Sequence, residues 1–117
     1  MKDEQTIDFT SEVKSEERKM LKLLEGLSSE QLKTNKEFIH QVSFQSIALK
    51  YLADDIAKNG VKEKYCNGAN QWGYKDRTEV KTYNNMFKNY QSAMKQLNDL
   101  VAISGKSTDD NFEGFAQ

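Results

Sequence analysis

Apolar residues recur along most of this chain at the three- and four-residue steps of an α-helix. In the first third, this spacing predicts a helix of about 16 residues that Thr10 or Ser11 caps and that ends near Gly26. Residues 1–9 show no such pattern, so a flexible N-terminus is expected there. Ser28 and Ser29 can cap a further short helical piece.

Two longer helices are predicted after this piece. One covers roughly residues 35–59 and is apolar around much of its circumference, which indicates packing against two neighbours. The other begins at Asp76 or Thr78 and ends at Ser104–Gly105. It carries a heptad-type seam, interpreted as core or as an oligomer interface, made of Val80, Tyr83, Phe87, Tyr90, Met94, Leu97 and Val101.

The segment between these helices, residues 61–75, is predicted to be a small β-hairpin or an ordered loop. Asn67–Gly68 favours a tight turn, because both residue types tolerate positive φ. Isolated hairpins are marginal in water, so this one is expected to lean on the helices. Its aromatic residues either pack there or form a contact surface, and they are Tyr65, Trp72 and Tyr74.

These elements predict a mainly α fold, a helical bundle with a long antiparallel helix pair joined by a short β-hairpin or ordered loop. The expected organisation is a flexible N-terminus (1–9), a single helical domain (10–104) and an acidic flexible tail (105–117). A length of 117 residues suits one domain, and the absence of proline lets the helices run long. No apolar run approaches the ~18 residues of a membrane span, and the polar N-terminus does not resemble a signal peptide. For these reasons we expect a cytoplasmic protein with no membrane partner. A single cysteine, which allows no internal disulfide, agrees with this expectation.

The distribution of charge is more informative than the net charge of -1. Residues 57–95 carry eight basic and three acidic side chains, a balance of +5, between two acidic ends. This basic middle is either an ordinary wet helix face or a phosphate-binding surface. The residues that would contact DNA are Lys62, Lys64, Lys75, Arg77, Lys81, Lys88 and Lys95, of which the last three are seven apart and share one stripe beside the seam.

We find no pattern that predicts catalysis. His40 is the only histidine, which is too few for a catalytic zinc site or a Cys/His zinc finger, so no metal and no cofactor are expected. Asp54 and Asp55 are adjacent on a helix and point in different directions, which favours a solvated face. A nucleophile pair of Cys66 with His40 is the weakest of the hypotheses.

Residues 60–101 resemble the C-terminal half of phage terminase small subunits, of the kind found in tailed phages of Gram-positive bacteria. The matching features are the helix end at Asn59–Gly60, the Asn67–Gly68 segment with Gln71, and the step Gly73-Tyr74-Lys75. A helical pattern follows at Tyr83-Asn84, Met86, Lys88-Asn89-Tyr90, Leu97 and Leu100.

The resemblance implies a non-catalytic DNA-recognition subunit of a genome-packaging motor. Such a subunit would assemble as a ring in the host cell cytoplasm, bind viral DNA and present it to the terminase large subunit, which carries the ATPase and the nuclease. One departure is the lack of a convincing helix-turn-helix with a short Gly-containing turn. DNA contact would then rest on the basic stripe and the hairpin, and would be mostly phosphate-directed.

A different class of function is also compatible with these patterns. A compact helical protein with acidic ends could cap a basic enzyme or toxin, as a small inhibitor or immunity-type protein does. That hypothesis predicts a monomer without DNA affinity, whereas the packaging hypothesis predicts a homo-oligomer that binds DNA.

Overall fold

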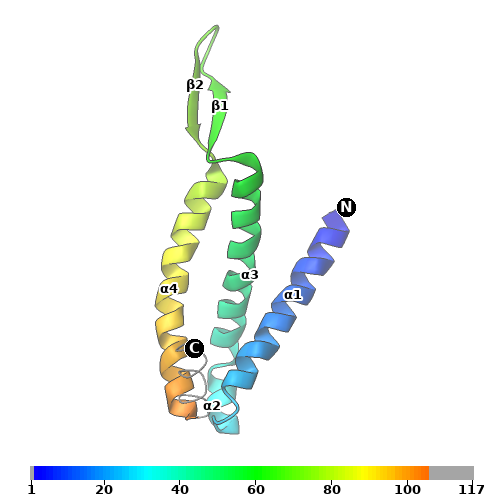
Figure 1. The fold of residues 1–117 in the computed structure, drawn as a ribbon, viewed down its shortest axis with the longest axis vertical. Helices are drawn as coiled ribbons and strands as arrows, with labels where there is room; N and C mark the ends of the chain where they lie inside the picture. The colour runs from blue at the N-terminus through cyan, green and yellow to red at the C-terminus, as the bar shows by residue number, and fades with distance from the viewer. Residues whose placement is uncertain (1, 106–117) are drawn as a thin grey trace, which may run out of the picture.

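The computed structural model describes residues 2–105, and Met1 and residues 106–117 lie outside the described part. The elements in chain order are α1 (Lys2–Leu23), α2 (Ser29–Thr34), α3 (Lys36–Asn59), β1 (Lys62–Cys66), β2 (Trp72–Asp76) and α4 (Thr78–Ser104). The mainly helical fold is confirmed, with α3 and α4 running antiparallel and joined by a hairpin (Figure 1). The predicted acidic tail lies outside the described residues except for Gly105.

The ends of α3 and α4 agree with the capping residues seen in the sequence. Gly60 follows α3 with φ of 80°, and Gly105 follows α4 with φ of 65°, in the region that favours glycine. The predicted short helix is confirmed as α2, where Ser28 and Gln31 form a capping box. With no proline to interrupt them, α3 and α4 reach 24 and 27 residues. Together with the hairpin they give the molecule its extents of 63 × 33 × 27 Å.

The predicted start of the first helix is wrong. The helix α1 begins at Lys2, so neither Thr10 nor Ser11 caps it, and it ends at Leu23, before the turn that holds Gly26. The periodicity of apolar residues did not predict the helix before Thr10, because an apolar partner of this part lies on another helix. The Phe9 ring packs edge-on against Phe44 and Tyr51 of α3, at centroid distances of 5.3 and 5.2 Å.

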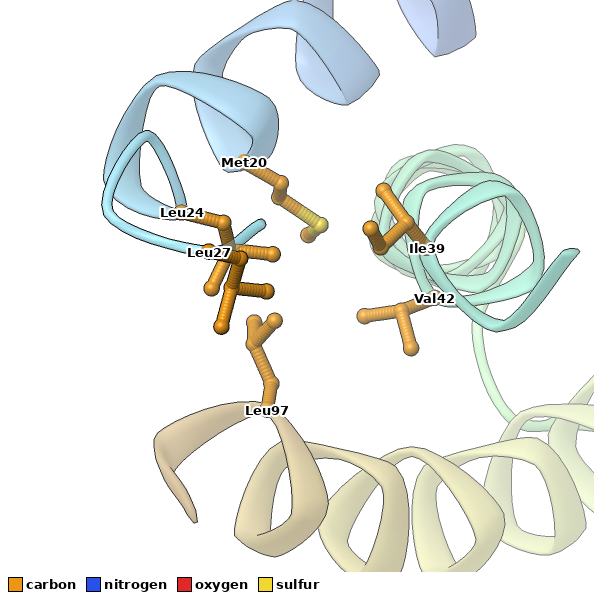
Figure 2. Close-up of a cluster of buried hydrophobic side chains, with 6 residues drawn as sticks. All are labelled: Met20, Leu24, Leu27, Ile39, Val42 and Leu97. Atoms are coloured by element: carbon orange, nitrogen blue, oxygen red, sulfur yellow. The ribbon is translucent and has the colours of Figure 1, made fainter. Parts of the chain in front are cut away.

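The hydrophobic core sits at the end of the molecule where α2 lies. Figure 2 shows six side chains from three directions converging there: Met20, Leu24, Leu27, Ile39, Val42 and Leu97. Ser43 is fully buried beside them, and its hydroxyl donates to the Ile39 carbonyl over 2.8 Å and to the Met20 sulfur over 3.3 Å. The small side chain lets α1 and α3 approach closely without leaving a buried polar group unpaired.

Farther from this core, polar contacts join the aromatic ones between α1 and α3. Ser46 donates to the Glu16 carboxylate over 2.7 Å, and His40 lies 3.4 Å from Glu17. Toward its N-terminus α1 leans away from the pair of α3 and α4 (Figure 1). The bundle is therefore three helices thick at the α2 end and opens toward the hairpin end.

The α4 seam is only partly enclosed as a result. Leu97 is its one buried member and belongs to the core. Phe87 is exposed, and the other five seam positions are half-buried. Tyr83 and Phe87 stack with centroids 6.0 Å apart and planes 5° apart. The seam is thus most enclosed at Leu97 and leaves aromatic surface accessible toward the hairpin.

The expectation that the hairpin leans on the helices is wrong. It stands beyond the ends of α3 and α4 as a continuation of the long axis (Figure 1). Every residue from Val61 to Asp76 is exposed except Gly73, which is half-buried. The hairpin is therefore held at its base rather than along a face.

Candidate nucleic-acid interface

An arginine fixes the base of the hairpin to the end of α3. Arg77 donates from Nη1 to the Gly60 carbonyl and from Nη2 to the Asp55 carboxylate, each over 2.7 Å. Its backbone N–H donates to the Val61 carbonyl over 2.9 Å, and Glu79 lies 3.5 Å from the same guanidinium. The hydrogen bond from Arg77 lowers the pKa of Asp55, and the bond to Asp55 raises the pKa of Arg77. With 11% of its side chain exposed, Arg77 presents little surface to a ligand, although the sequence put it among the DNA contacts.

The pairing of the two strands places lysines and aromatic rings on one side of the hairpin. Lys62 lies opposite Asp76, Lys64 opposite Tyr74, and Cys66 opposite Trp72. Since directly paired residues lie on the same face and alternate residues share it, Lys62, Lys64, Trp72 and Tyr74 form one surface, the aromatic–lysine face. Trp72 is 62% exposed and Tyr74 is 71% exposed. Both rings are therefore largely solvated.

The length of the loop between β1 and β2 determines which side of the hairpin carries the two rings. The tight turn predicted at Asn67–Gly68 is instead a loop over residues 67–71, with the Asn67 N–H donating to the Gln71 carbonyl over 2.7 Å. Gly68 and Asn70, not Asn67, have positive φ. A two-residue turn at Asn67–Gly68 would shift the pairing by an odd number of residues, and would put Trp72 and Tyr74 on the side of Glu63. The longer loop places both rings beside the lysines.

Local charge contacts organise the aromatic–lysine face. The Lys64 ammonium lies 4.9 Å from the centroid of the Trp72 ring, within cation–π range. Lys62 pairs with Asp76 over 2.7 Å at the base of the face, and this hydrogen bond lowers the pKa of Asp76. Both partners are largely exposed, so the pair is weak and a phosphate can compete with the carboxylate for the lysine.

The opposite side of the hairpin serves its internal packing. The Tyr65 ring lies over Gly73, where an added Cβ would be 3.1 Å from the ring atoms. Lys75 lies 5.9 Å from the centroid of that ring and 3.5 Å from Glu63. Tyr65 and Lys75 thus stabilise the strand pair, whereas Trp72 and Tyr74 are left for contacts outside it.

The lysine stripe on α4 consists of Lys81, Lys88 and Lys95, and all three are exposed. No acidic residue occurs between Glu79 and Asp99. Successive members of the stripe are about 10.5 Å apart along the helix, at 1.5 Å per residue. The positive charge of Lys81 also contributes to the lowered pKa of Asp76, after the hydrogen bond from Lys62. The stripe therefore begins close to the base of the hairpin, since α4 starts at Thr78, two residues after β2 ends at Asp76.

The two residues of the enzymatic hypothesis lie at opposite ends of the molecule. His40 is in the first turns of α3 near the core, and Cys66 is at the far end of β1. The part of α3 that follows His40 alone spans about 28 Å, at 1.5 Å per residue. The Cys66 thiol donates to the Gly68 carbonyl over 2.8 Å within the hairpin. This structure does not bring the two side chains together as a nucleophile and a base.

The acidic residues do not form a metal site in the described part. Asp55 is engaged by Arg77, and it also accepts a hydrogen bond from Asn59 over 2.8 Å. Among residues 2–105, no group of three or more His, Cys, Asp or Glu side chains is placed to hold a metal ion.

A pocket that the sequence did not indicate lies between α1, α2 and α3. It has a volume of about 240 Å³. Its lining consists of the apolar residues Leu21, Leu32 and Ile39 and the charged residues Glu17, Lys33 and Lys36. A contiguous apolar segment would have been the signal for such a site, but its members come from three separate helices.

Two further findings bear on the class of protein. Over the described range 2–105, no helix is long and apolar enough to cross a membrane. The chain matches no protein-family model, no curated protein and no solved structure.

Proposed function

We propose that this protein is a non-catalytic DNA-recognition subunit of the phage terminase type, which binds viral DNA and presents it to the large ATPase and nuclease subunit. The observation that carries the proposal is the row of exposed lysines on α4, which starts one turn after the hairpin that bears the aromatic–lysine face. Together with the sequence resemblance at residues 60–101, this surface favours DNA as the ligand.

Charge supports phosphate contact along this surface. From residue 62 to residue 104 the chain carries seven basic and four acidic side chains, a balance of +3. Two of these four carboxylates are already paired near the base of the hairpin. Glu79 lies 3.5 Å from Arg77, and Asp76 lies 2.7 Å from Lys62. Along α4, no acidic residue lies between the first and the last lysine of the stripe, so these lysines can replace the counterions that condense on DNA.

The partly open seam supports assembly of several copies. A long helix pair that leaves Phe87 exposed and Tyr83 half-buried retains apolar surface that a second copy can cover. A homo-oligomeric ring is the arrangement we propose. A light-scattering mass in solution equal to one chain would contradict it.

The DNA part of the proposal is tested by reversing the charge of the stripe. In the variant K81E/K88E/K95E, duplex affinity at low salt is expected to fall by about tenfold or more. The slope of log affinity against log salt should decrease by about 2.7, at ~0.9 per lost phosphate contact. Fluorescence anisotropy with a labelled duplex measures both quantities.

The matched control is K14E/R18E/K19E, which reverses three exposed basic residues of α1 and changes the net charge equally. Its affinity and salt slope should stay close to those of the unmodified protein. An equal loss in both variants would indicate that only net charge matters, and no loss in the stripe variant would refute the assignment of the surface.

The inhibitor or immunity-type alternative has less support from the geometry. It needs acidic surface near the N-terminus, yet Glu16 and Glu17 are turned toward Ser46 and His40 of α3. A monomer without DNA affinity would nevertheless favour it, and the two measurements above detect that outcome.

A further inference from the structure

We propose that the aromatic–lysine face of the hairpin binds unpaired nucleotide bases, so that single-stranded DNA is its ligand. This inference rests on the proposed function and deepens it, because it assigns the hairpin a ligand different from the duplex that the lysine stripe contacts. The starting observation is that Trp72 and Tyr74 are the two most exposed large apolar side chains of the described residues.

The spacing of the two rings fits a base. Trp72 and Tyr74 are two residues apart on β2 and so project from the same face. At 3.3–3.4 Å per strand residue, their attachment points are about 6.7 Å apart. This is about twice the 3.4 Å separation of stacked bases, so one base can lie between the two rings or one can stack on each.

The lysines are placed where the sugar-phosphate backbone would run. Lys62 and Lys64 are on the neighbouring strand β1, and Lys64 pairs directly with Tyr74 across the hairpin. The face therefore has an aromatic edge and a basic edge, one strand spacing of about 4.8 Å apart. Single-stranded nucleic acids are bound by this combination of stacking platforms and backbone charge.

The hairpin is mounted so that a strand can reach it. It projects beyond both helices, and Arg77 fixes its base by bonds to Asp55 and Gly60 (Figure 1). The rings pack against no helix, so binding does not have to displace them from the core. Stacking needs the bases to be unpaired, because duplex bases present only their edges in the grooves.

Protein is the less suitable ligand for this face. Protein hot spots lie in enclosed, desolvated pockets surrounded by a rim. All the strand residues other than Gly73 are exposed, so the hairpin offers two rings and two charges without a concavity. An acidic peptide is therefore treated as an outcome of the test.

The experiment uses the intrinsic fluorescence of the full-length protein. Trp72 is the only tryptophan of the chain, so its emission reports directly on the hairpin. Titration with an oligo(dT) strand of about 12 nucleotides should quench this emission. Tyr74→Ala should weaken oligo(dT) binding by about 5- to 150-fold, the factor expected for one lost stack. Its duplex affinity should stay within about twofold, since phosphate contacts dominate duplex binding.

Two further variants keep the result interpretable. Lys14→Gln removes one positive charge from the exposed surface of α1 and should leave oligo(dT) affinity unchanged, provided that circular dichroism shows an intact fold. Trp72→Phe retains a ring and should bind a labelled oligo(dT) more tightly than Trp72→Ala, measured by anisotropy. If Trp72→Phe and Trp72→Ala bind equally, stacking at this position is refuted.

The remaining outcomes separate this inference from the proposed function. Duplex binding that depends on the lysine stripe, without quenching by oligo(dT), overturns the hairpin inference and leaves the proposed function standing. Absence of both duplex and oligo(dT) binding overturns both. Equal quenching by a poly-glutamate peptide or by polyphosphate shows that charge alone is recognised, and it also overturns the stacking inference.

Discussion

Truncation of Leu97 tests whether the helix pair is held mainly at the α2 end. Leu97 is 3% exposed and packs in the six-residue core. Leucine to alanine removes three carbons, worth about 2.4 kcal/mol at ~0.8 kcal/mol per buried methylene, and the remaining cavity raises the cost to about 3 kcal/mol. At 4–8 °C per kcal/mol, the midpoint of thermal unfolding should fall by roughly 12–24 °C.

Phe87→Ala is the matched comparison, because it truncates the same seam of α4 at a position that is 41% exposed. Water fills the space left by a half-solvated ring, so no cavity term applies, and alanine also favours the helix. The expected cost in free energy of unfolding is about 1 kcal/mol. This is less than for Leu97→Ala, although phenylalanine loses more carbon atoms than leucine on truncation to alanine.

Urea denaturation followed by far-UV circular dichroism measures both free energies of unfolding. It should be repeated at two protein concentrations, because assembly through the seam would make the Phe87 cost depend on concentration. Equal costs for the two variants, or a larger cost for Phe87→Ala in dilute solution, would refute the view that α4 is held mainly at the α2 end.

Two other predictions concern single contacts at opposite ends of the bundle. A Cβ at Gly26 would overlap the backbone oxygen of Ser104, whose hydroxyl also accepts from the Gly26 N–H over 3.2 Å. Gly26→Ala should therefore cost about 1–3 kcal/mol in urea denaturation, and Ser29→Ala at the exposed start of α2 should cost less than 0.5 kcal/mol, a difference that must vanish if the connection can shift. At the hairpin base, the pKa of Asp55 is lowered by Arg77, so the contact contributes stability above the ordinary aspartate pKa of about 3.9 that is lost as pH falls through the lowered value. Amide protection factors in β1 and β2, taken against the intrinsic exchange rate at each pH, should fall on acidification in that range, and Arg77→Gln should show the lower protection already at neutral pH; unchanged protection in this variant would exclude the clamp.

Local signals in the sequence predicted the elements that depend on local physics. The periodicity of α3 and α4, and the glycines at positions 60 and 105, located those helices to within a residue or two. The part of α1 around Phe9 was missed because the aromatic partners of this ring, Phe44 and Tyr51, are far away in sequence.

The geometry of the candidate site was less accessible to sequence reasoning. The lysine positions followed from heptad spacing, but the side of the hairpin occupied by Trp72 depends on a loop of five residues rather than two. The free-standing hairpin depends on one arginine that bonds to Asp55 and Gly60, a role that a basic residue next to other basic residues does not reveal. Long-range pairing determined both features.

The position of the core has a mechanical consequence. The core cluster lies near α2 and the hairpin lies at the far end of a 63 Å molecule, so α3 and α4 hold the hairpin far from the core. A tilt of the helix pair about the core would therefore move the hairpin tip farther than it moves the residues near the core. In the proposed assembly, such a tilt would change the separation between the hairpin tips of neighbouring copies.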